Sequence, residues 1–193
     1  MLYSFVPNSP KIKGKKMSLI KIVDVENATG KVKDIYEEIQ TVFGSVPNGI
    51  RLWSINPDAL EAQWNGIKVN MGMDLDKQKL YTVLRFLIAE NDDCEYCTGF
   101  NKAMLLNMYG FTLDEIINIQ KDISTAPLEV QNKALLVFAL KSLEDAHSIN
   151  KDDISNLESL GCSQKEIFDI VTSAGQMRIV TTLFDTFKVE IDY

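Results

Sequence analysis

Residues 80–103 read LYTVLRFLIAENDDCEYCTGFNKA, and they hold the strongest local pattern in the chain. In the first half, apolar side chains recur at spacings of three and four, which is typical of one face of a helix. They are Leu80, Val83, Leu84, Leu87 and Ile88. A second helix is expected from Cys94 to about Met108, with Asp92 or Asp93 as its N-cap. The two cysteines of the stretch therefore mark the beginning of a helix.

Helical spacing also dominates the sequence on both sides of this stretch, and no segment alternates convincingly as a strand does. Capping boxes predict helix starts at Thr112, three residues before Glu115, and at Ser163, three residues before Glu166. Other helices are expected over residues 29–43, 49–55 and 57–71, after Asp76, and from 127 to about 145. The sequence therefore predicts an all-α fold, a compact bundle of eight or nine helices.

The length of 193 residues fits one domain, which we place at residues 17–193. Residues 1–16 contain four lysines and no acidic residue, and Pro7, Pro10 and Gly14 interrupt any regular pattern. We therefore expect residues 1–16 to be a flexible basic extension outside the fold.

The composition is that of an ordinary globular protein, with 46% hydrophobic and 24% charged residues. The net charge of −7 argues against nucleic acid or an anionic membrane as a partner. The longest apolar run, residues 134–140, is much shorter than the ~20 residues that a membrane-spanning helix needs. Three cysteines are too few, and odd in number, for a secreted disulfide framework, so we expect a cytoplasmic protein.

Cys94 and Cys97 form a CxxC motif, the one strong chemical signal in the sequence. Residues three apart on a helix lie one turn apart on the same side, close enough for a disulfide. At a helix N-terminus, backbone N–H groups and the helix dipole stabilise a thiolate, which is the nucleophilic form of cysteine. The carboxylates of Asp92, Asp93 and Glu95 act in the opposite direction, because nearby negative charge disfavours a thiolate.

Three interpretations of the motif are open from the residues alone. Zinc would need two more ligands, and Cys162 and His147 are not spaced as a zinc site, so no metal or other cofactor is expected. Two inert buried thiols are the second interpretation, and a redox-active pair is the third. A thioredoxin-like context is excluded, because no strand–helix–strand pattern surrounds the motif.

Residues 80–103 resemble the core motif of the alkylhydroperoxidase D-like, or carboxymuconolactone decarboxylase, superfamily. Residues 35–39 (IYEEI), 44–48 (GSVPN) and 133–154 are similar to other parts of that superfamily, so the resemblance extends over about residues 25–190. It implies an all-α fold whose helical units assemble into dimers, trimers or hexamers. For redox-active members, it implies that Cys97 attacks a peroxide and that Cys94 resolves the product as a disulfide.

The chain departs from the superfamily at the residues that would deprotonate the attacking thiol. Asn101 stands where redox-active members have a histidine, and Thr82 stands where they have a glutamate. Tyr96 replaces a histidine that many members have before the second cysteine. General-base assistance is typically worth ~10²–10⁴-fold, so weak peroxidase turnover is expected unless Glu90 or Glu95 substitutes. Asn101 can hydrogen-bond a thiol or a substrate, but it cannot act as a base.

These observations predict a thiol-dependent antioxidant or redox protein that reduces a peroxide or a disulfide and is recycled by a thiol reductant. It is expected to be a homo-oligomer with no nucleic-acid or membrane partner. Two alternatives stay open: a non-catalytic oligomeric or redox-sensing helical module, and a lactone enzyme of the carboxymuconolactone decarboxylase type. The only arginines are Arg51, Arg85 and Arg178, and none falls in a motif that would hold the carboxylates of a lactone acid.

Overall fold

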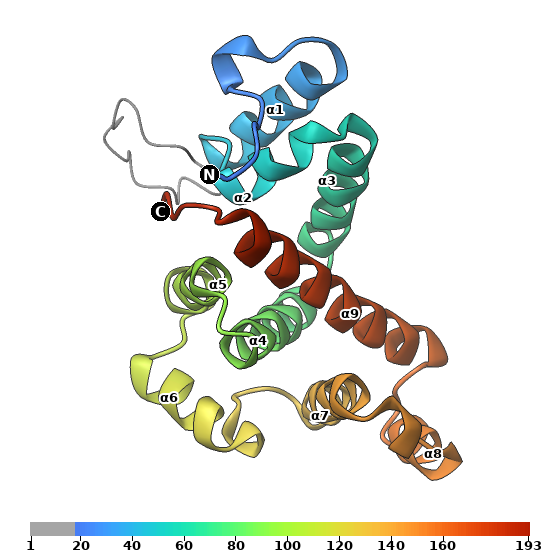
Figure 1. Ribbon diagram of the computed structural model, residues 1–193. Helices are drawn as coiled ribbons and strands as arrows, with labels where there is room; N and C mark the ends of the chain where they lie inside the picture. The colour runs from blue at the N-terminus through green and yellow to red at the C-terminus, as the bar shows by residue number, and fades with distance from the viewer. Residues whose placement is uncertain (1–17) are drawn as a thin grey trace. The chain divides into compact units, whose positions relative to one another are not determined.

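The computed structural model describes residues 18–193, so the expected extension over residues 1–16 lies outside the described part of the chain. The described residues form nine α-helices (Figure 1): α1 (Gly30–Phe43), α2 (Asn48–Arg51), α3 (Pro57–Met71), α4 (Leu75–Asn91), α5 (Glu95–Asn107), α6 (Leu113–Lys121), α7 (Val130–Glu144), α8 (Lys151–Ser159) and α9 (Gln164–Phe187). Short 3₁₀ segments accompany them: η1 (Val25–Asn27), η2 (Leu52–Ile55), η3 (Ile123–Thr125) and η4 (Ala146–Ser148). Residues 18–193 contain no strand, so the all-α prediction with eight or nine helices is confirmed. No helix in this range combines the length and the apolar character that crossing a membrane requires.

Several helix ends lie where the sequence predicts them. Asn56 caps α3, because its side-chain oxygen accepts hydrogen bonds from two backbone N–H groups at 3.1 and 3.3 Å. Both predicted capping boxes form. The hydroxyl of Thr112 accepts a hydrogen bond from the N–H of Glu115, and the N–H of Thr112 donates to the carboxylate of Glu115. Ser163 and Glu166 make the same two hydrogen bonds. Hydrogen bonds between residues that are close in the sequence therefore set these helix boundaries.

Two helix starts differ from the prediction. α4 begins at Leu75 rather than at Asp76, because the carboxylate of Asp74 accepts a hydrogen bond from a backbone N–H of the first turn at 2.8 Å. α7 begins at Val130 rather than at Pro127, because the backbone first makes a tight hydrogen-bonded turn. In both places the N-cap that forms is a neighbouring acidic residue.

Contacts divide the described residues into two compact units. Among the described residues, the first unit consists of residues 18–72 and Leu183–Tyr193, and the second unit is Met73–Thr182. Each unit is described by itself below. The single domain that the sequence predicts over residues 17–193 stays a prediction.

The core of the first unit forms between α1 and α3. Trp64 is only 2% exposed, and its ring meets that of Phe43 edge-on with the centroids 5.9 Å apart. Its indole N–H donates a hydrogen bond to the carboxylate of Glu38 at 2.7 Å. The C-terminal segment closes on the start of α2, where the backbone N–H of Asn48 donates to the carboxylate of Asp192 at 2.7 Å.

In the second unit, α4 packs against both α5 and α7. Its buried residues are Leu80, Tyr81, Thr82, Val83, Leu84, Phe86, Ile88 and Ala89. A helix that has neighbours on several sides buries most of its circumference, whereas a surface helix buries one stripe. The consecutive buried positions of α4 therefore reflect its neighbours on both sides, and polar residues of α4 are brought against α5.

Glu166, in the first turn of α9, makes an acid-sensitive contact in the second unit. The Lys77 ammonium, 2.6 Å away, and hydrogen bonds from Ser163 lower the pKa of the Glu166 carboxyl from its ordinary 4.5 to about 2. Because the folded-state pKa is the lower one, the stabilisation is present above the unfolded-state value and is lost as the pH falls through the folded-state value.

Glu166→Gln is therefore expected to lower the free energy of unfolding by about 1–2 kcal/mol at neutral pH, with allowance for the partial exposure of the carboxylate. At a pH near the folded-state pKa, the difference from the original protein should largely vanish. Urea unfolding at a series of pH values measures this effect, and a loss that is the same at every pH would contradict the ion-pair explanation.

Candidate functional site

Cys94 connects the end of α4 to the beginning of α5. Asp93 is in the left-handed conformation (φ 54°), which short polar side chains tolerate. The N–H of Asp93 donates to the carbonyl of Glu90 at 3.2 Å, and the N–H of Cys94 donates to the carbonyl of Ala89 at 3.0 Å. These two bonds make a Schellman motif that ends α4. Cys94 is also the N-cap of α5, so the prediction that Asp92 or Asp93 would cap this helix is wrong. The reason is that Asp93 is used to end the preceding helix.

Asp92 instead holds this junction to α9. Its carboxylate accepts a hydrogen bond from the hydroxyl of Thr181 at 2.8 Å and lies 3.2 Å from Nε of Arg178. The ion pair compensates part of the negative charge that the sequence places beside the cysteines. The junction is therefore fixed by contacts to α9 as well as by its own backbone.

Both cysteines of the motif are buried thiols. The exposed fraction of the residue is 0% for Cys94 and 3% for Cys97. Cys97 is the third residue of α5 and lies in its first turn, at the positive end of the helix dipole. Asn101 lies four residues after Cys97, so these two side chains share one face of α5.

Arg85 of α4 joins Asn101 and Thr82, the two positions where the superfamily has a histidine and a glutamate. Nε of Arg85 donates to Oδ1 of Asn101 at 3.1 Å, and a terminal nitrogen donates to the hydroxyl oxygen of Thr82 at 2.8 Å. Nδ2 of Asn101 in turn donates to the backbone carbonyl of Cys97 at 2.8 Å. The hydroxyl of Thr82 donates to the carbonyl of Gln78 at 2.8 Å. Arg85 is thus held by hydrogen bonds to one side chain of its own helix and one of α5.

No sequence motif indicates Arg85 as a site residue. Arg51 is ion-paired with Asp24 at 2.6 Å, and Arg178 is ion-paired with Asp92. Within residues 18–193, by contrast, no carboxylate lies within ion-pairing distance of Arg85, and burial lowers the pKa of its guanidinium. The signal that could have found it is its place three residues after Thr82, one turn along the same face of a helix.

The two glutamates that could replace the missing base have other surroundings. Glu90 accepts a hydrogen bond from the side-chain amide of Gln120 in α6. Glu95 is the exposed first residue of α5. A catalytic role for either one stays a prediction. The rings of Tyr96 and Phe100 stack on each other with centroids 6.3 Å apart, so these neighbours of the thiols pack together.

Cys162, the third cysteine, is buried just before α9. Its thiol donates to the carbonyl of Gln131 at 3.9 Å, and burial raises the pKa of this thiol. Its environment is therefore the opposite of one that activates a cysteine. In the described part of the chain, no group of three or more His, Cys, Asp or Glu side chains is placed to hold a metal ion.

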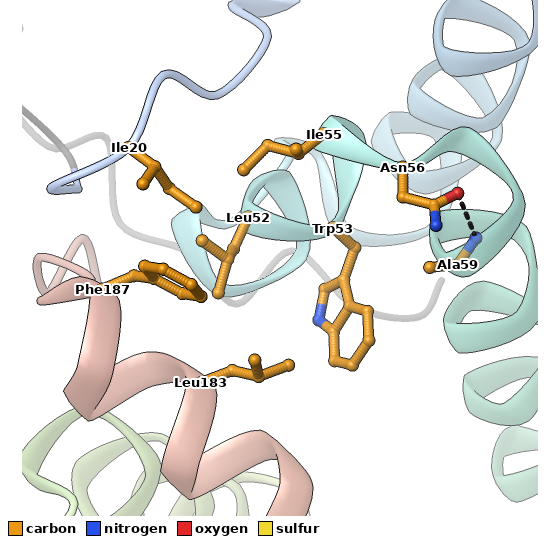
Figure 2. Close-up of a pocket in the computed structure, with 8 residues that line it drawn as sticks. All are labelled: Ile20, Leu52, Trp53, Ile55, Asn56, Ala59, Leu183 and Phe187. Atoms are coloured by element: carbon orange, nitrogen blue, oxygen red, sulfur yellow. Dashed lines mark hydrogen bonds between the residues drawn. The ribbon is translucent and has the colours of Figure 1, made fainter.

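A cavity of about 190 Å³ lies in the first unit (Figure 2). It is lined by Ile20, Leu52, Trp53, Ile55, Asn56, Ala59, Leu183 and Phe187. The side chain of Asn56 is already used to cap α3, and Figure 2 shows its bond to the N–H of Ala59. The cavity therefore offers apolar contacts, and its lining contains neither a nucleophile nor an ionisable group.

Comparison by sequence finds no matching protein-family profile and no matching curated protein. Comparison by structure finds solved proteins that match over almost the whole chain. One, from Ralstonia eutropha JMP134, is described as an alkylhydroperoxidase AhpD core, an uncharacterized peroxidase-related protein. It is 20% identical, with a TM-score of 0.76 over 92% of this chain and 94% of its own. An uncharacterized peroxidase-related protein from Silicibacter sp. TM1040 is 18% identical, with a TM-score of 0.73 over 93% and 94%. A variant of the debrominase Bmp8, solved with 2,3,4-tribromopyrrole, is 15% identical, with a TM-score of 0.66 over 93% and 92%.

These likenesses define the class of protein by its fold. The chain shares its all-α fold with these solved proteins, one of which is described as an alkylhydroperoxidase AhpD core, and the resemblance that residues 80–103 carry is confirmed at the level of the fold. Two of the solved proteins that share this fold are described as uncharacterized peroxidase-related proteins.

Proposed function

We propose that this chain is a thiol-dependent redox protein that reduces a peroxide or a disulfide through Cys97 and Cys94. The placement of the two thiols carries this proposal. Cys97 lies in the first turn of α5, where the helix dipole favours a thiolate, and Cys94 is the N-cap of the same helix, three residues earlier. The structural likeness to peroxidase-related proteins supports the same chemistry.

In the peroxide reaction, the Cys97 thiolate attacks one oxygen of the peroxide and the O–O bond breaks. The second oxygen leaves with the bonding electrons and takes up a proton, so that an alcohol or water departs. Cys97 is then a sulfenic acid, and the Cys94 thiol condenses with it to form a disulfide and release water. An external dithiol supplies two electrons and two protons by thiol–disulfide exchange and restores both thiols.

Asn101 and Thr82 support this site as hydrogen-bonding groups, since neither can take a proton from Cys97 at neutral pH. Their side chains hold Arg85 at 3.1 and 2.8 Å. Glu90 and Glu95 are the remaining candidates for proton transfer. Without a base in contact with the thiol, turnover with peroxide is expected to be weak.

The proposal extends to the partners of the reaction. The substrate is a peroxide or a disulfide, and a thiol reductant recycles the cysteine pair. The chain forms a homo-oligomer, which is a dimer, a trimer or a hexamer. The proposal places the protein in the cytoplasm, where a reducing thiol pool keeps cysteines such as these available.

Disulfide formation after addition of hydrogen peroxide or cumene hydroperoxide, followed by mass spectrometry, tests the proposal. The original chain should form the Cys94–Cys97 disulfide in a saturable reaction that is faster than the oxidation of an ordinary thiol. Cys97→Ser should abolish this reaction, and Cys94→Ser should stop it at the sulfenic acid of Cys97. Cys162→Ser is the matched control and should leave the rate unchanged.

Oxidation no faster than that of an ordinary thiol would overturn the peroxidase activity. It would leave disulfide exchange, redox sensing or assembly as the function. A lactone-processing activity that survives Cys94→Ser would instead favour the carboxymuconolactone decarboxylase type of enzyme.

A further inference from the structure

Arg85 is a charged group at the cysteine site that the chemistry above does not use. Its guanidinium is held at two points, by Asn101 at 3.1 Å and by Thr82 at 2.8 Å. Both acceptors are buried, with exposed fractions of 4% and 0%. Because a guanidinium is planar, two hydrogen bonds fix its position and its orientation. Arg85 is therefore a fixed charge, unlike a mobile surface arginine.

This charge lies at the turn of α5 that contains Cys97. The link is the amide of Asn101, which accepts from Arg85 with its oxygen and donates to the backbone carbonyl of Cys97 with its nitrogen. Side chains of a helix lean toward its N-terminus, so the Asn101 side chain covers the preceding turn on the face that it shares with Cys97. Two hydrogen bonds therefore connect the guanidinium to the residue proposed to react.

No carboxylate in residues 18–193 balances the charge of Arg85, although both other arginines are ion-paired. Residues 1–17 add no acidic side chain, since they contain neither Asp nor Glu. In a partly buried place the effective dielectric constant is low, and a cation without a counter-ion attracts an anion strongly. The anion that this site can itself produce is the Cys97 thiolate.

We propose that Arg85 is a positioning residue that stabilises the Cys97 thiolate. Its fixed positive charge favours the thiolate form of Cys97. In redox-active members of the superfamily, a histidine and a glutamate produce the thiolate by taking its proton. The inference rests on the proposed function, because it takes Cys97 as the reacting thiol. The proton of Cys97 passes to water rather than to Arg85, which stays charged throughout.

Other charged groups near the thiols set the background for this effect. Asp92, Asp93 and Glu95 oppose a thiolate, and the ion pair with Arg178 partly compensates the first of them. Tyr81 stays neutral while a cysteine titrates, because burial raises the pKa of Tyr81 to about 12. Further titratable groups on or beside the packed elements include Glu90, Tyr109, Glu166 and Asp169.

Titration of the Cys97 thiolate by its ultraviolet absorbance tests the proposal. The background carries Cys94→Ser and Cys162→Ser, so that one cysteine titrates. In this background the pKa of Cys97 is expected below the ordinary value of ~8.5. Arg85→Gln should raise it by about one unit, which is about a tenfold loss of thiolate at a pH below the pKa. Arg85→Lys keeps the charge and should restore at least half of that shift. Lys165→Gln removes an exposed positive charge from the same unit and should leave the pKa of Cys97 unchanged.

An unchanged Cys97 titration in Arg85→Gln would overturn the inference, as would equal shifts in the glutamine and lysine variants. If circular dichroism shows that Arg85→Gln does not fold, the background protein alone decides. A Cys97 that titrates at or above the ordinary value contradicts a stabilised thiolate. The titration uses no peroxide, so a Cys97 that titrates low but is not oxidised contradicts only the proposed function.

Discussion

Asn101→His combined with Thr82→Glu is expected to raise the rate of peroxide-driven disulfide formation by about 10- to 100-fold. The two substitutions restore the histidine and the glutamate that redox-active members of the superfamily have at these positions. Asn101 lies on the same face of α5 as Cys97, so an imidazole there would stand over the turn that holds the thiol. The expected gain lies at or below the lower limit of the ~10²–10⁴-fold that general-base catalysis supplies, because Arg85 already favours the thiolate.

Arg85 lies between the two substituted positions and hydrogen-bonds to both. Its terminal nitrogen, which now donates to Thr82, would face the new carboxylate, and its Nε would face the new imidazole. The matched control is Asn101→Gln with Thr82→Gln, which changes the same positions without adding a titratable group. The rate constant from stopped-flow mixing with hydrogen peroxide is the measurement. Equal rates in the two double variants would show that a missing base does not limit this protein.

Trp64→Ala is expected to lower the free energy of unfolding by about 3–5 kcal/mol. The tryptophan is 2% exposed in the core of the first unit. The substitution removes the edge-on contact with Phe43, the hydrogen bond to Glu38 and the contact of the Lys68 ammonium with the ring. Equilibrium unfolding in urea, followed by circular dichroism, measures the loss.

The control for this substitution is the chain's other tryptophan. Trp53 is partly exposed and lines the cavity of the first unit, so Trp53→Ala removes less packing and should cost under about 2 kcal/mol. Similar losses for both tryptophans would contradict the difference in burial. The same curves test the predicted single domain, because one domain gives one cooperative transition and two independent units give two.

Much of the fold could be predicted from the sequence because helix boundaries depend on nearby residues. The capping boxes at Thr112 and Ser163 involve hydrogen bonds over three residues, and both form as predicted. The error at Cys94 is instructive. Aspartate is a favourable N-cap residue, but Asp93 is part of the turn that ends α4, and Asp92 is paired with Arg178 of α9.

The sequence by itself determined the all-α class, most helix limits, and the placement of two thiols one turn apart at a helix start. These follow from periodicity and local hydrogen bonding, which act over a few residues. Only the tertiary structure decided that Arg85 joins Thr82 to Asn101, and that Asp92 is paired with Arg178. The bond from Arg85 to Asn101 joins α4 to α5, and the ion pair of Asp92 with Arg178 joins the end of α4 to α9. Both depend on tertiary contacts, which a linear pattern of residues does not record.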